Sequence, residues 1–235
     1  MIISVNKLPS NFKPYPFKSF KMKALSVKQA LALGPKPTVP EITDLIQELT
    51  GDEIDAKLLV PIDVKYLLAM LAFHAYPKQS WTLPLTCPEC GKAHTRTVTM
   101  KDFPPIPSLT DDDPYPLTID DGKHVYELGY ASVDAISKID MDKADYLELI
   151  AAHTLAIDGS KENIKETLLE IEDFGVLSTM VQAIHKFFQE ETYSEFKCPE
   201  CGKPYKVAMS AVEVTQYTPF HDTKTAGGYK TNFRL

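Results

Sequence analysis

The chain has 235 residues, a hydrophobic fraction of 44% and a formal net charge of −7. These values are ordinary for a globular protein, and the longest apolar run, residues 66–73, is too short to cross a bilayer. The first residues lack the basic head and apolar stretch of a secretory signal. We therefore expect a protein of a reducing compartment, with no membrane partner.

Residues 1–24 are predicted to form an extended arm, because their prolines exclude a helix, and their four aromatic side chains should lie against another surface. Residues 1–40 carry seven lysines and no acidic residue, so the remainder sums to −14 (−7 − 7). This asymmetry predicts docking on an acidic surface of the chain itself or of a partner. The alternative is a solvated, lysine-rich segment.

Three helices are predicted to follow the arm. Ser26 can cap a short helix that ends near residue 33, and Pro40 opens a second helix that ends near Gly51. The third helix runs over about 61–76 and is apolar on nearly every side. A helix of this kind is expected in the middle of a core.

Two strand–turn–strand segments come next, separated by a long insertion. Their predicted strands are residues 81–86, 95–100, 193–197 and 205–209. Residues 104–191 are too many for a loop and should fold separately. Within them we predict a β-hairpin over 117–130 and helices over about 143–157, 163–171 and 177–188.

The most informative motif is the string Cys-Pro-Glu-Cys-Gly-Lys, which occurs at residues 87–92 and again at 198–203. Its cysteines, Cys87, Cys90, Cys198 and Cys201, are the only four in the chain. Each turn offers two thiolates, and tetrahedral Zn²⁺ takes four. The sequence therefore predicts one structural Zn²⁺ bound by all four, with no open position for water or substrate.

Three other interpretations of the cysteines compete with the metal site. A thioredoxin-type redox pair needs its second cysteine inside a helix of a βαβ unit, whereas Gly-Lys and strand-like sequence follow each pair here. Two disulfides need an oxidising compartment. Four unligated thiols would mean that the metal site has decayed, but both copies of the six-residue motif are intact and identical.

No catalytic signature is present, so we predict that the protein is not an enzyme. Asp173-Phe174-Gly175 is interpreted as a junction between helices, and His94 as unnecessary beside four cysteines. An alternative function is a zinc-ribbon regulator that binds nucleic acid. The acidic body and the presence of only two arginines, Arg96 and Arg234, count against it.

The predicted fold class is α+β, a zinc ribbon made of two knuckle hairpins that share one metal, with N-terminal helices and a large inserted subdomain. The expected units are the arm (1–24), the helices with the first knuckle (25–103), the inserted hairpin and helical subdomain (104–191), the second knuckle (192–210) and an extended tail (211–235). The tail is rich in Thr, Tyr and Gly and is expected to order on a partner.

The order of these features resembles the baseplate hub subunits and hub-assembly proteins of T-even-like contractile-tailed bacteriophages. Leu8-Pro9-Ser10 followed by Tyr15-Pro16 carries the resemblance, and its specific elements are the Leu8-Pro9-Ser10 opening and the paired knuckles. The resemblance spans about residues 8–210 and departs at Asn11, where a glycine is expected, and after Met209. It implies a structural or assembly role in the virion tail baseplate, put together in the host cytoplasm, with other tail proteins as partners and no small-molecule substrate.

Overall fold

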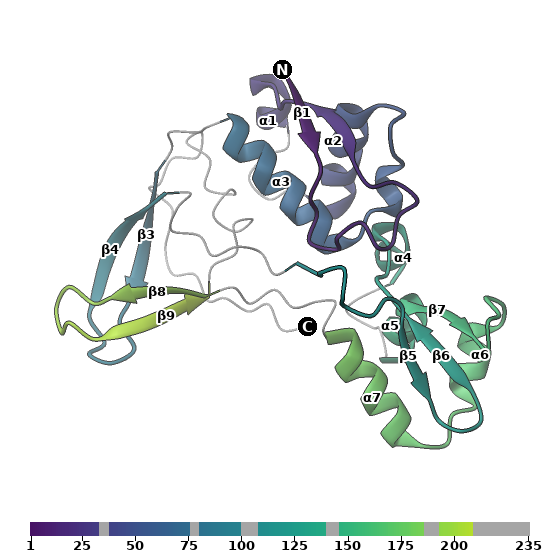
Figure 1. Cartoon of the computed structure of the whole chain (residues 1–235). Helices are drawn as coiled ribbons and strands as arrows, with labels where there is room; N and C mark the ends of the chain where they lie inside the picture. The colour runs from purple at the N-terminus through teal and green to yellow at the C-terminus, as the bar shows by residue number, and fades with distance from the viewer. Residues whose placement is uncertain (33–37, 76–79, 100–107, 140–145, 186–192, 209–235) are drawn as a thin grey trace.

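The computed structural model describes residues 1–32, 38–75, 80–99, 108–139, 146–185 and 193–208. It is a mixed α+β fold with several small antiparallel sheets (Figure 1). Residues 1–75 form an N-terminal lobe, residues 108–185 an insertion lobe, and residues 80–99 and 193–208 a hairpin pair. The tail, the proline-rich link at 104–107 and the predicted helix end at 186–188 lie outside the described residues. The predicted division into units remains a prediction.

In the N-terminal lobe, the predicted arm forms two strands, β1 (Ile2–Val5) and β2 (Phe20–Lys23), which pair antiparallel. Their side chains alternate between solvent and a core shared with α2 and α3. The arm thus lies against another surface as expected, and that surface belongs to its own chain.

The predicted N-terminal helices are present as α1 (Val27–Ala32), α2 (Val39–Thr50) and α3 (Pro61–Ala75). The Ser26 hydroxyl accepts from the backbone N–H of Gln29 at 3.2 Å, which confirms the predicted cap. Gly51 ends α2 with φ of 62°, a conformation that glycine adopts without a Cβ penalty. A short 3₁₀ turn, η1 (Ala56–Leu58), was not predicted.

The insertion lobe contains a three-stranded sheet in the order β5 (Leu117–Asp120), β6 (Val125–Leu128), β7 (Thr154–Ile157). The β5–β6 hairpin was predicted. The prediction of helix through residue 157 was wrong, because α5 (Tyr146–His153) ends at His153 and the next four residues form β7. Pairing with the open edge of β6 satisfies their backbone groups, and helical propensity does not reveal that partner.

Three further helices complete this lobe: α4 (Val133–Ser137), which was not predicted, α6 (Ile164–Leu169) and α7 (Phe174–His185). The two lobes are joined by backbone hydrogen bonds, from Val133 to Leu59 and from Leu109 to Pro9, both at 2.8 Å. Tyr15 packs against the cores of both lobes. The insertion is thus folded onto the N-terminal lobe.

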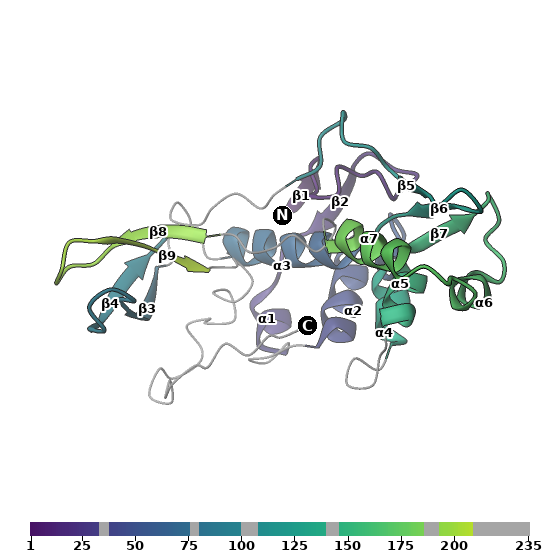
Figure 2. The same cartoon turned by 90° about the horizontal axis from the view of Figure 1, so that it is seen from below.

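The hairpin pair consists of β3 (Trp81–Thr86) with β4 (Ala93–Val98), and β8 (Tyr193–Lys197) with β9 (Pro204–Ala208). The strands β4 and β9 begin one or two residues earlier than predicted. Both views place the two hairpins side by side at one side of the molecule (Figures 1 and 2). Their shared core is small and consists of Leu83, Cys87, Val98, Phe196, Cys198 and Tyr205.

Candidate metal centre

Each Cys-Pro-Glu-Cys-Gly-Lys turn has the same backbone hydrogen bonds. Cys87 donates to the carbonyl of Lys92 at 3.0 Å, and Gly91 donates to the carbonyl of Cys87 at 2.9 Å. In the second turn the equivalent distances, Cys198 to Lys203 and Gly202 to Cys198, are both 3.0 Å. Gly91 and Gly202 have φ of 69° and 72°, positive values that glycine adopts without a Cβ penalty. Two copies of one local structure therefore present their thiols in the same way.

The structure brings all four cysteines together although 107 residues (91–197) lie between Cys90 and Cys198. Their Sγ atoms lie within 4.8 Å of one another. Two pairs across the hairpins, Cys87–Cys201 and Cys90–Cys198, have Sγ–Sγ distances of 3.8 Å. A tetrahedral ion with Zn–S bonds of ~2.3 Å requires sulfur–sulfur distances of about 3.8 Å. A disulfide requires about 2.05 Å, so the arrangement fits a metal and excludes a disulfide.

The electrostatics of the cluster also favour a cation. Backbone N–H groups of Cys201 and Glu200 point at the Cys198 sulfur and lower its pKa to about 6. The Lys203 N–H lowers the pKa of Cys201, but burial and the neighbouring thiols outweigh it and raise that pKa to about 11. Without a metal the Cys201 thiol therefore stays protonated at neutral pH. A divalent ion would stabilise the ionised sulfurs and hold all four cysteines as thiolates.

Around the thiols, the two hairpins contact each other reciprocally. Lys92 pairs with Glu200 at 3.2 Å, and Lys203 pairs with Glu89 at 2.7 Å. These pairs are solvent-exposed and add little stability, but they show that the turns face each other through an approximate two-fold relation. The cysteines alternate accordingly, with Cys87 and Cys198 buried and their partners exposed.

His94 and Tyr205 occupy equivalent positions, each four residues after the second cysteine of its turn. The His94 Nε2 lies 2.7 Å from the Tyr205 hydroxyl, and the two rings meet edge to face. His94 is not part of the cysteine cluster. It therefore joins the two hairpins and leaves the metal positions to cysteine.

A second polar feature was not found by sequence reasoning. Asp63, at the start of α3, is fully buried and accepts hydrogen bonds from the Ser10 N–H at 3.0 Å, the Ser10 hydroxyl at 2.6 Å and the Tyr15 hydroxyl at 2.7 Å. The Tyr15 oxygen in turn accepts from the Val60 N–H at 2.8 Å. Burial raises the pKa of Asp63, and the donors from Ser10 and Tyr15 oppose this. Since all its partners donate, we describe Asp63 as a carboxylate.

This network explains the Leu8-Pro9-Ser10 and Tyr15-Pro16 motifs: they bind the N-terminal segment to α3. It also explains Asn11, which stands where a glycine was expected. Asn11 has φ of 52°, in the left-handed region that glycine adopts most easily and asparagine next. Its side-chain amide also donates to Asp111 at 2.8 Å, which fixes the Asp111-Asp112-Asp113 turn against the arm.

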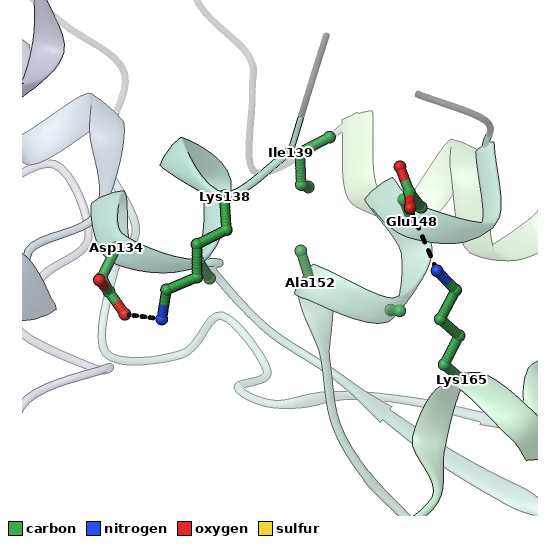
Figure 3. A pocket seen from close by; sticks show the side chains of 8 residues that line it. Asp134, Lys138, Ile139, Glu148, Ala152 and Lys165 are labelled. Carbon is green, nitrogen blue, oxygen red and sulfur yellow. Dashed lines mark hydrogen bonds and ion pairs between the residues drawn. The ribbon is translucent and has the colours of Figure 1, made fainter. Parts of the chain in front are cut away.

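A hollow of about 360 Å³ lies between α4, α5 and α6 (Figure 3). Its charged side chains form two ion pairs, Lys138–Asp134 at 2.6 Å and Lys165–Glu148 at 3.1 Å. The rest of the wall is alanine and isoleucine: Ala135, Ile139, Ala151 and Ala152. Among the described residues, no histidine, cysteine or hydroxyl group lines this hollow.

The comparison with protein families decides the identity. A model of the T4 bacteriophage base plate protein family matches residues 1–213. The chain belongs to this family. No curated protein and no solved structure matches it.

The match includes both knuckle motifs and the Ser10–Tyr15 segment, and it confirms the resemblance to T4-like baseplate proteins that the sequence indicated. Membership of the base plate family means a structural protein of the virion tail that contacts other tail proteins. It also agrees with the expectation of a non-enzymatic role. None of the helices in the described ranges is long and apolar enough to span a membrane.

Proposed function

We propose that this baseplate protein acts in the hub region as a non-catalytic structural or assembly component, and that a structural Zn²⁺ holds its two hairpins together as a zinc ribbon. The ligands are Cys87, Cys90, Cys198 and Cys201. The observation that carries the proposal is the convergence of four thiols at tetrahedral spacing in a chain of the base plate family.

The role of the metal follows from the size of the hairpin pair. A two-stranded hairpin is marginally stable alone, and the core that the two hairpins share is small. Zinc binding at a four-thiolate site contributes about 10–16 kcal/mol in small zinc-finger peptides, which is enough to fold such a unit. The four protein ligands complete the coordination, so the ion has no position for a substrate. The role of the ion is therefore structural: it holds the two hairpins together.

The alternative, nucleic-acid binding through the ribbon, has less support. The Arg96 guanidinium lies 4.7 Å from the centre of the Phe196 ring, and Lys92 and Lys203 each pair with a glutamate. These three cations thus have partners within the protein. The acidic surplus of the body would also repel a phosphate backbone.

Metal content tests the zinc proposal. Protein purified without added metal should contain one zinc per chain by elemental mass spectrometry, and Co²⁺ exchange should give the absorption of a four-thiolate site. Cys198→Ser should lose the metal, whereas the matched control His94→Ala should retain it. Metal-free protein with its native fold, or loss of zinc from the His94 variant alone, would contradict the assignment.

The position in the tail needs a separate experiment. Phage in which the gene is inactivated should accumulate incomplete baseplates, and labelled protein should be found at the hub by electron microscopy of purified baseplates. Normal baseplates without the protein, or label only at the baseplate periphery, would contradict a hub role. This outcome would leave the metal assignment unaffected.

A further inference from the structure

The junction between α6 and α7 exposes two large apolar side chains. Phe174 has 85% of its surface exposed and Leu169 has 63%. Between them lie three acidic residues, Glu170, Glu172 and Asp173, and no basic residue. We call residues 169–174 the acidic corner. The Lys123 ammonium lies 4.0 Å from Glu172 at its edge, so the corner keeps an acidic surplus. Apolar side chains this exposed, with a polar rim, are typical of a protein–protein contact.

The N-terminal sheet has the complementary surface. Strand alternation buries Ile3, Val5, Phe20 and Met22, and it directs Ile2, Ser4, Lys21 and Lys23 to solvent. Ile2, which is 68% exposed, lies directly opposite Lys23 in the strand register. Neither Lys21 nor Lys23 forms an ion pair with any residue in the described ranges. We call Ile2, Ser4, Lys21 and Lys23 the basic face.

The two surfaces lie far apart on one molecule. The strands of the basic face are at one edge of the N-terminal lobe, and α6 is at the far edge of the insertion lobe in both views (Figures 1 and 2). They therefore cannot meet within one chain. Some other acidic side chains are already engaged internally: the Asp111 carboxylate accepts from the Asn11 amide at 2.8 Å, and the Asp113 carboxylate accepts from the Thr110 N–H at 2.6 Å.

We propose that the basic face of one copy binds the acidic corner of a second copy. Each surface has an apolar centre flanked by charges, and the charges are opposite, which favours this pairing over two like surfaces meeting. The contact joins two different surfaces, so every bound copy still offers one of each. Association then continues until a ring closes. This inference goes beyond the proposed function and is tested on purified protein alone.

The test uses full-length, metal-loaded protein and two double variants. Ile2→Ser with Lys23→Glu removes the basic face, and Leu169→Ser with Phe174→Ser removes the acidic corner. In light scattering and sedimentation, wild-type protein should associate with rising concentration, and less so at high ionic strength. Each variant alone should be monomeric. An equimolar mixture should form a dimer of one copy of each, because one intact surface of each kind remains.

Lys57→Glu with Leu58→Ser is the matched control, since Leu58 is 57% exposed on η1, outside both surfaces. The control should associate like the wild type, and circular dichroism should show that all variants are folded. A wild type that stays monomeric at every concentration would overturn the proposal. So would a mixture of the two variants that remains monomeric, or a variant that still associates fully.

Discussion

The Ser10–Tyr15–Asp63 network gives a prediction whose size follows from its geometry. Tyr15→Phe removes one hydrogen bond to the buried Asp63 carboxylate, a bond of 2.7 Å. It also leaves the Val60 N–H without the acceptor that it has at 2.8 Å. A hydrogen bond to a charged group contributes about 1.5–3 kcal/mol, and an orphaned buried donor costs about 1–3 kcal/mol. We expect a loss of roughly 3–5 kcal/mol in the free energy of unfolding.

Ser10→Ala removes only the hydroxyl donor at 2.6 Å, because the Ser10 backbone N–H remains on Asp63. Its expected cost is smaller, about 1.5–3 kcal/mol. Since both hydroxyls bind the same carboxylate oxygen, the double variant should depart from additivity.

The assay is urea unfolding followed by circular dichroism at fixed zinc concentration. The matched control is Tyr146→Phe, the same chemical change on a side chain that is 73% exposed, and it should leave stability unchanged. If Tyr15→Phe costs no more than the control, then the network does not anchor the N-terminal segment and the reasoning is refuted.

Three further predictions concern the metal, a buried histidine and the left-handed turn. Chelation of zinc, or Cys198→Ser, should raise the hydrogen-exchange rates of backbone amides in the hairpin pair alone, because its core is separate from the two lobe cores. An equal rise in the lobes would contradict this. Burial lowers the pKa of His153 to about 4 in the folded protein, whereas the pKa in the unfolded chain is ~6.5. The free energy of unfolding is therefore greatest above pH ~6.5 and falls by about 3 kcal/mol as the pH drops to ~4. His153→Gln should flatten unfolding free energies measured across that range. In urea unfolding, Asn11→Gly should leave the free energy of unfolding nearly unchanged, whereas Asn11→Ala should lower it by about 1–2 kcal/mol because residue 11 has a left-handed φ. Equal losses in the two variants would contradict this prediction.

Features determined by local chemistry were readable from the sequence. The Ser26 cap and the Gly51 helix end each depend on a few neighbouring residues. The identity of the four candidate ligands was equally local, because thiols with this spacing have few other uses in a reducing compartment. The β5–β6 hairpin belongs to the same class, since its turn residues lie between its two strands.

Features that depend on a distant partner were decided by the tertiary structure. Residues 154–157 are apolar enough to extend α5, and they become β7 because β6 offers an unpaired edge. Asp63 looked like an ordinary first-turn helix residue, and its burial depends on donors that lie 48 and 53 positions earlier in the chain. The lysine-rich arm could have been a solvated lead, but its alternating apolar side chains are covered by α2 and α3. A sequence pattern specifies what a segment can bury or pair, and packing of the whole chain selects the partner.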